Sequence, residues 1–194
     1  MGFQGVPLVK TANKKDISEF AAQIADQLDC YPGRVFAPID LPRLLEIRAH
    51  QVFGLNVEIQ DLDPSVEGIT IPGEPATLVF SSKMYDRLTD YANGRDRFTA
   101  AHEFGHVTMH APQLSREYRS YNQRSSRLYR RSDIPWVRDP EWQANKFATY
   151  LLMPAWAVRE VVLTTGPNAG VLADIFQVSL QAMGYRLEEL GIPS

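Results

Sequence analysis

The sequence contains one cysteine, little net charge and no long hydrophobic run. Because Cys30 has no partner for an internal disulfide, the chain is not a disulfide-stabilised small domain and suits a reducing compartment. The 20 Lys and Arg residues nearly balance 23 Asp and Glu, and the net charge of −3 gives no general attraction to nucleic acid. No segment is apolar for long enough to span a membrane, and the first residues lack the apolar run of a signal peptide. We therefore expect a cytoplasmic protein without a membrane partner.

The chain has 194 residues, of which 44% are hydrophobic, and this is enough for one well-packed domain with additions. Apolar residues recur at helical spacing between residues 16 and 28, and residues 41–48 suggest a second helix. Three short segments then have the alternation or the apolar content of strands, at residues 56–60, 67–71 and 76–80. The pattern predicts N-terminal helices followed by a small sheet.

The most informative motif is His-Glu-Phe-Gly-His at residues 102–106. Residues four apart share one face of a helix, so His102 and His106 can hold one ion together. Glu103 lies about 100° round the helix, where it can reach a ligand of that ion without binding the ion itself. A zinc hydrolase needs this arrangement of two nitrogen ligands, an open position for water and a nearby base. The alternative is two surface histidines on an ordinary amphipathic helix.

The residues around the motif favour the metal interpretation. Phe98, Ala101 and Phe104 can bury one side of the helix, and no proline or run of charge interrupts it before Pro112, where we expect it to end. A glycine inside a helix costs about 1 kcal/mol relative to alanine. Such a cost at Gly105 is understandable if another element packs closely beside the ligands.

A catalytic zinc needs a third ligand, and Glu141 is the candidate. Asp139 can cap the start of a helix, Pro140 suits the first helical position, and Pro154 marks the end. The residues that recur at helical spacing as the core face are Ala144, Phe147, Ala148, Leu151 and Leu152. Glu141 could point inward beside this face, or it could be a first-turn glutamate favoured by the helix dipole. The spacing leaves both possibilities open.

The His-Glu-Phe-Gly-His motif, followed by Glu-x-x-Ala-Asn-x-Phe-Ala-x-x-Leu-Leu-Met-Pro at residues 141–154, resembles the ImmA/IrrE family of metallopeptidases. Residues 176–187 also resemble the third block of that family, so the match covers roughly residues 70–190. The resemblance implies a zincin-like α+β fold. We expect residues 1–165 to form the metallopeptidase domain and residues 166–194 to form a helical extension packed on it.

The same resemblance implies a metal site and a function. Zinc would be held by His102, His106 and Glu141, and Glu103 would be the general base. The activity would be that of a zinc endopeptidase in transcription regulation, with a protein substrate such as a DNA-binding helix-turn-helix repressor or an antitoxin. The alternative is a non-proteolytic metal-binding regulator or antitoxin-like partner that acts by binding. Glu103 favours the enzyme, because a pure binding module does not need that carboxylate.

Other polar residues have ordinary explanations that stay open beside a functional one. His110 or Tyr150 could donate a hydrogen bond to the oxyanion, but a helix-end histidine and a packing tyrosine explain them equally. Asn145 could orient Glu141, or it could be a surface asparagine. We expect His50 to be structural.

Two segments could suggest nucleic-acid binding. Residues 113–138 are rich in Arg and Tyr and could contact phosphates, dock an acidic partner surface or form a solvated loop at the cleft, and we favour the loop. Residues 171–191 have the pattern of a helix-turn-helix. The second helix, however, offers few base-reading side chains and ends with Glu188 and Glu189, which would repel phosphates. We therefore expect a structural helical pair and no direct contact with nucleic acid.

Overall fold

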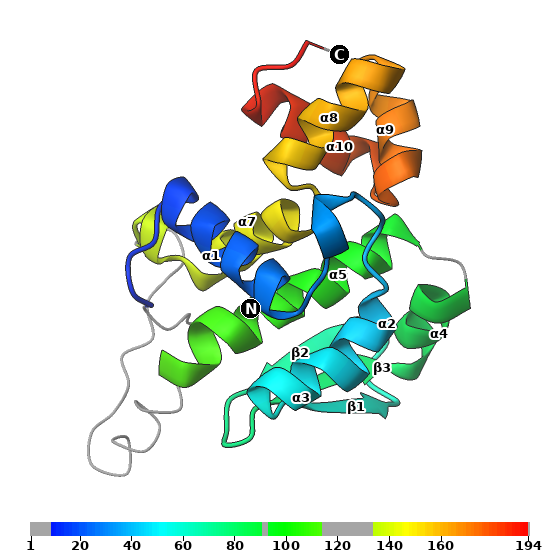
Figure 1. The fold of residues 1–194 in the computed structure, drawn as a ribbon. Coiled ribbons are helices and arrows are strands. Elements are labelled where there is room, and N and C mark those ends of the chain that lie inside the picture. Colours follow the sequence, from blue (N-terminus) through cyan, green and yellow to red (C-terminus); the bar gives the residue numbers. More distant parts are fainter. Residues whose placement is uncertain (1–8, 91–92, 114–133, 194) are drawn as a thin grey trace.

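The protein has a mixed α+β fold in which N-terminal helices and a small sheet are followed by long helices (Figure 1). The computed structural model describes residues 9–90, 93–113 and 134–193. In chain order its elements are α1 (Lys14–Gln27), η1 (Pro32–Arg34), α2 (Leu41–Arg43), η2 (Leu44–Ala49), α3 (His50–Phe53), β1 (Asn56–Gln60), β2 (Gly68–Ile71), β3 (Thr77–Ser81), α4 (Ser82–Asp90), α5 (Gly94–Gly105), η3 (His106–His110), η5 (Trp136–Arg138), α7 (Pro140–Leu152), α8 (Ala155–Thr165), α9 (Ala169–Phe176) and α10 (Leu180–Glu189).

The sheet has three strands in the order β1-β3-β2. β1 runs parallel to β3, whereas β2 is antiparallel to β3 with Gly68 opposite Phe80. The middle residues of β3 are buried on both faces of the sheet. On β2, by contrast, Ile69 and Ile71 are 40% and 49% exposed. β2 is therefore an edge strand whose outer side is not covered by another strand of the described sheet.

The N-terminal helix shows how local signals define the elements. Asn13 caps α1 by accepting hydrogen bonds from the backbone N–H groups of Lys15 and Asp16, and the Asp16 carboxylate accepts one from the N–H of Asn13. Ile17 and Ile24 lie on the buried face. The helix predicted between residues 16 and 28 is confirmed to within two residues at each end.

The other N-terminal predictions hold with two differences. The predicted strands appear as β1, β2 and β3, each displaced by no more than one residue at an end. The helix predicted at residues 41–48 continues to Phe53 through the wider π-type turn η2. Helix α4 was not predicted. It follows β3 without a loop, because the Ser81 hydroxyl accepts a hydrogen bond from the N–H of Met84 and so caps its first turn.

The helix that carries the histidine motif continues beyond its predicted end at Pro112. Asn93 caps α5, which begins at Gly94, and the chain continues through the π-type turn η3 into residues 111–113, which are still helical. The prediction that Pro112 ends the helix is therefore wrong. A proline lacks the N–H of the regular helical hydrogen bond, and the wide turn just before it shifts that register, so the helix accommodates it.

Helices α5 and α7 pack directly against each other in the centre of the molecule (Figure 1). They approach each other closely at Gly105, where an added Cβ atom would lie only 2.9 Å from Cδ1 of Phe147. This contact explains why the motif helix contains a glycine. It also sets the distance between the two helices on which the predicted metal ligands lie.

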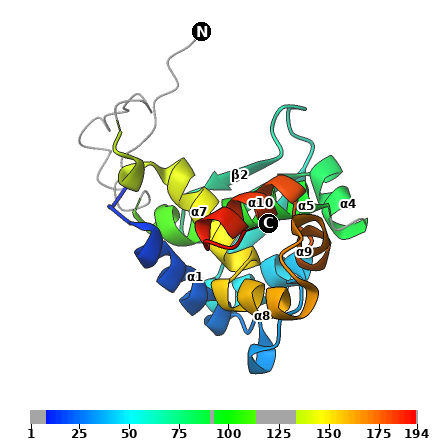
Figure 2. The ribbon, with the colours of Figure 1, turned by 90° about the horizontal axis from the view of Figure 1, so that it is seen from above.

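The C-terminal helices α8, α9 and α10 gather at one end of the molecule (Figure 1), and Figure 2 shows the same group from above. Arg186 of α10 donates a hydrogen bond to the Met153 carbonyl over 2.9 Å, and Glu189 pairs with Lys14 of α1 at 3.1 Å and with Lys146 of α7 at 2.8 Å. The group is thus tied to α1 and α7. The predicted domain boundary at residue 165 stays a prediction. No helix in the described ranges is both long and apolar enough to cross a membrane.

Candidate metal centre

Three predicted ligands come together between α5 and α7. His102 lies near the end of α5, His106 begins η3 one turn later, and Glu141 lies in the first turn of α7. The His102 Nε2 atom is 3.4 Å from Glu141 Oε2, and the His106 Nε2 atom is 3.3 Å from Glu141 Oε1. The two Nε2 atoms are 2.9 Å apart. Ligand atoms of the three residues all lie within 4.8 Å of one another.

The spacing of these atoms is compatible with a zinc ion. Two ligands that bind zinc at about 2.0–2.1 Å in tetrahedral geometry are about 3.3 Å apart. The two histidine-to-glutamate distances of 3.4 and 3.3 Å, which end on different oxygens of Glu141, are close to this value, and the histidine-to-histidine distance of 2.9 Å is somewhat shorter. Two imidazoles and one carboxylate also form a donor set that is typical of catalytic zinc sites.

Glu141 is placed by the way in which α7 begins. Asp139 caps the helix by accepting a hydrogen bond from the Glu141 N–H at 3.0 Å, and Pro140 occupies the first position. Glu141 is therefore a first-turn glutamate and at the same time faces the histidines. The contacts of its carboxylate with the imidazoles of His102 and His106 hold the pKa of this carboxyl well below its usual range. Burial lowers the pKa of His102, but the contact with Glu141 outweighs burial and raises it.

Asn145 contacts a different residue from the one expected. Its Oδ1 atom lies 3.0 Å from the Nδ1 atom of His102, so it orients the imidazole rather than the Glu141 carboxylate. The physical reason is the helical repeat, because Asn145 lies one turn beyond Glu141 on α7 and reaches the neighbouring turn of α5. Asn145 is also exposed, so the description as a surface asparagine holds, although its side chain contacts His102.

His106 contacts the buried His110, which in turn contacts Gln143, a residue that was not singled out in the sequence. Its Nδ1 atom lies 2.9 Å from Nδ1 of His110, and His110 Nε2 lies 3.1 Å from Oε1 of Gln143. His110 and Gln143 are each only 1% exposed. Burial lowers the pKa of His110 to about 4, and the nearby His106 adds to this effect. A signal for Gln143 existed: it precedes Phe147 by four residues and so lies on the core face, where a polar side chain needs a partner.

Glu103 lies against the edge strand β2. The Thr70 hydroxyl donates a hydrogen bond to Glu103 Oε2 over 2.7 Å. A Cβ atom at Gly68 would lie 2.9 Å from Cγ of Glu103, so the glycine leaves the space that this side chain occupies. Neither Gly68 nor Thr70 was singled out in the sequence, since both are more than 30 residues away from the motif and only the fold brings them to it.

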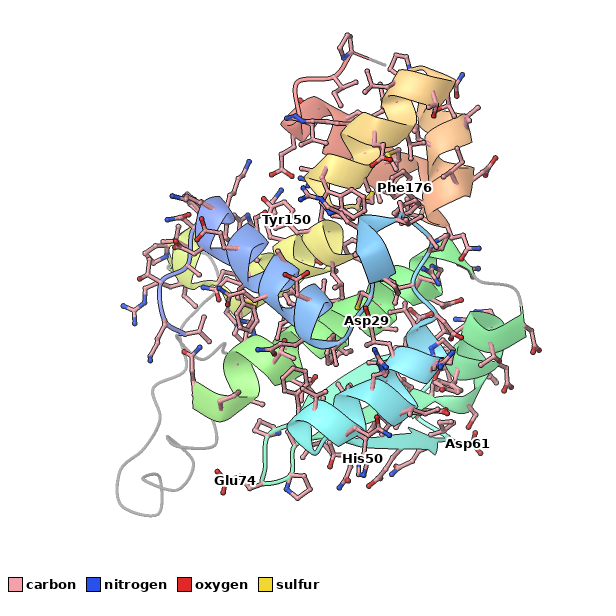
Figure 3. All side chains as sticks on the ribbon, in the orientation of Figure 1. Asp29, His50, Asp61, Glu74, Tyr150 and Phe176 are labelled. Atoms are coloured by element: carbon pink, nitrogen blue, oxygen red, sulfur yellow. The ribbon has the colours of Figure 1, made fainter. Side chains whose placement is uncertain are left out.

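The remaining polar residues of interest lie away from the ligands. His50 is close to the sheet on α3 (Figure 3), and its Nδ1 atom is 2.8 Å from the Leu55 carbonyl oxygen, in agreement with a structural role. Tyr150 is on α7, and its hydroxyl donates a hydrogen bond to Glu189 of the C-terminal helices at 3.0 Å (Figure 3). The Arg- and Tyr-rich residues 114–133 lie outside the described residues, so the three interpretations of that segment stay predictions.

A cavity of about 930 Å³ lies between α5 and α7 on one side and α10 on the other, and none of the three predicted ligands lines it. Asn145, the partner of His102, lines it together with Phe98 and Trp142. The opposite wall is formed by α10, including Gln181 and Tyr185. The second helix of the segment with a helix-turn-helix pattern, α10, therefore faces this cavity with part of its surface.

Comparisons with known proteins agree with the fold and the motif. A family model described as the IrrE N-terminal-like domain, Peptidase M78, matches residues 90–188, which include all three predicted ligands. A solved structure named as a Mycobacterium tuberculosis transcriptional regulator has a similar fold, with a TM-score of 0.59 and 17% sequence identity. The match covers 90% of this chain and 46% of that one, so the chain spans about half the length of the regulator. Among curated proteins, none matches. The family match covers half of the sequence, and the chain therefore belongs to the IrrE N-terminal-like family of M78 peptidases.

Proposed function

We propose that the protein is a zinc-dependent endopeptidase that hydrolyses peptide bonds of a regulatory protein, such as a helix-turn-helix repressor. The observation that carries the proposal is the convergence of His102, His106 and Glu141 on one point, with Glu103 next to His102 in the chain and its carboxylate hydrogen-bonded to Thr70. Membership of a peptidase family supports the reaction class. The regulatory substrate is supported by the family resemblance and by the name of the transcriptional regulator with a similar fold.

The chemistry follows from the residues around the metal position. The two histidines and Glu141 would hold a zinc ion, which would supply Lewis-acid activation of a water molecule and of the peptide carbonyl. Thr70 fixes one oxygen of Glu103, Oε2. We assign proton transfer to the other oxygen, Oε1, which takes a proton from the attacking water and passes it to the leaving amine. Thr70 thus orients the base while Glu103 moves the proton.

The edge strand β2 is the element that we assign to substrate binding. It carries Thr70, so a peptide that paired with its backbone would lie next to Glu103. The other edge strand, β1, is separated from β2 by β3 and is therefore further from the base. The aromatic side chains of Phe98, Trp142 and Tyr185 in the adjacent cavity would accept apolar side chains of the same substrate.

The first test is the metal content of the purified protein. We expect about one zinc per chain in the wild type by mass spectrometry, and a marked loss in His106→Ala and in Glu141→Ala. Loss of zinc with His106→Ala alone would remove Glu141 from the ligand set. No metal in any sample after reconstitution with zinc would contradict the proposed chemistry.

The second test separates cleavage from binding. Glu103→Gln keeps the size of the side chain and removes the base, so it should retain zinc and lose cleavage. The zinc-loaded variant can then be used to capture the substrate, which the wild type should cut in the same mixture. If Glu103→Gln relieves repression as well as the wild type does, the protein acts by binding and the proteolytic proposal is wrong.

A further inference from the structure

We propose that Gln143 and His110 form a relay of hydrogen bonds that fixes the tautomer of His106, so that its Nε2 atom presents a lone pair to the metal position. This inference rests on the metal site of the proposed function but not on peptide cleavage. The relay runs from the backbone carbonyls of Lys10 and Val137 through Gln143 and His110 to His106. In each of these contacts one atom donates and the other accepts.

The orientation of Gln143 is fixed by two backbone carbonyls. Its Nε2 atom donates to the Lys10 oxygen over 2.8 Å and to the Val137 oxygen over 2.7 Å, which uses both amide hydrogens. If the amide were flipped, its oxygen would face two carbonyl oxygens in a site that is 1% exposed. Gln143 therefore presents Oε1, which can only accept, to His110.

The tautomer of His110 follows from the orientation of the Gln143 amide. Because Oε1 of Gln143 has no hydrogen, the 3.1 Å contact requires a hydrogen on Nε2 of His110. His110 is 1% exposed, and its hydrogen bonds lead to an imidazole and an amide rather than to a carboxylate, so the ring is neutral. A neutral ring with a hydrogen on Nε2 has a lone pair on Nδ1. His110 therefore accepts a hydrogen bond from His106.

His106 must then be the donor in the 2.9 Å contact between the two Nδ1 atoms. With the hydrogen on Nδ1, its lone pair is on Nε2, the atom that lies 3.3 Å from Glu141. This is the form that a zinc ligand needs, and an outer partner of this kind normally fixes it. His102 is held differently, because its Nδ1 partner Asn145 is exposed and can rotate its amide. The relay therefore fixes the tautomer of His106, one of the two histidine ligands, in the metal-free protein.

The tautomers of the metal-free protein test the relay directly. The chain has four histidines, so long-range ¹⁵N–¹H NMR spectra of the labelled wild type are tractable, and His50→Gln assigns the distant one. Spectra are recorded about two pH units above the ordinary histidine pKa of about 6.5. We expect the hydrogen on Nδ1 in His106 and on Nε2 in His110. A hydrogen on Nε2 of His106 as the main form would overturn the proposal.

Zinc affinity, measured by competition with a chelator, gives a second readout. His110→Leu removes the acceptor for His106 Nδ1 and should weaken zinc binding by roughly 10–100-fold, the usual effect of losing such a partner. His110→Gln should recover most of the affinity, because its amide offers an acceptor towards His106 and a donor towards Gln143. Wild-type affinity in His110→Leu, or no recovery in His110→Gln, would contradict the relay.

A control separates the relay from a general loss of stability. Val158→Ala removes methyl groups from a fully buried position of α8, which does not contribute to the relay, and should leave zinc affinity unchanged. If His110→Leu does not fold, the tautomers of the wild type still decide the question. If zinc binds as described and no peptide is cleaved, the relay stands and the proposed function fails.

Discussion

Replacement of Gly105 by alanine should destabilise the protein, although alanine is the better helix former. In a helix interior, the change from glycine to alanine alone stabilises by about 1 kcal/mol. At this position the new Cβ atom would lie 2.9 Å from Cδ1 of Phe147 and 3.3 Å from its Cβ and Cγ atoms. Overpacking of a core costs about 1–3 kcal/mol, so we expect a net loss of about 1 kcal/mol.

The ring of Phe147 has little room to move away. It is fully buried, and its centroid lies 6.0 Å from the rings of both Phe20 and Phe104. Part of the strain should therefore push α5 and α7 apart. Because His106 follows Gly105 directly and its partner Glu141 is on α7, zinc affinity should fall together with stability.

Gly184→Ala in α10 is the matched control. No atom would lie within 4 Å of its Cβ, so this change should stabilise by up to about 1 kcal/mol and leave zinc affinity unchanged. Urea unfolding of the two zinc-free variants and the wild type measures the difference. A Gly105→Ala protein at least as stable as the wild type would refute the argument from the Phe147 contact.

Two further variants test the base and the attachment of the C-terminal helices. Thr70→Val removes the hydrogen bond to Glu103 and should lower the kcat of peptide cleavage about tenfold with unchanged zinc content. Thr70→Ser keeps a hydroxyl and should retain activity. Equal rates in the Val variant and the wild type would exclude a role of Thr70 in orienting the base. Burial raises the pKa of Glu189, but hydrogen bonds from Lys146 and Lys14 outweigh burial and lower it to about 2. The stabilisation from this carboxylate is therefore present above the unfolded pKa of about 4.3 and is lost as the pH falls towards 2. Glu189→Gln should make stability less dependent on pH in that range, and an unchanged pH profile of unfolding would count against the ion pairs.

The parts of the site that were predictable from the sequence depend on the helical repeat. His102 and His106 are four residues apart, and that spacing alone gives them a common face. Glu141 is placed by capping signals at the start of its own helix, so its position was predictable, although its direction was not. The α+β class followed in the same way from alternating and helical patterns, which are local properties.

The missed residues depend on contacts between distant parts of the chain. Thr70 reaches Glu103 only because β2 lies beside α5, and nothing in the alternation of a strand indicates which helix will cover it. Gln143 is bound to Lys10, 133 residues away, and no local pattern contains that contact. Pro112 was misjudged for a related reason, since a π-type turn has no simple sequence signature and relaxes the usual restriction on proline.

The cavity between α5, α7 and α10 is lined by two kinds of element, those that carry the predicted metal ligands and one that does not. One wall belongs to α5 and α7, which also carry the predicted metal ligands, and the other belongs to α10. α10 contributes none of these ligands, so its cavity-facing residues, such as Gln181 and Tyr185, can change without altering the metal site. In the proposed peptidase, substrate preference could therefore diverge between related proteins while the chemistry of bond cleavage stays constant.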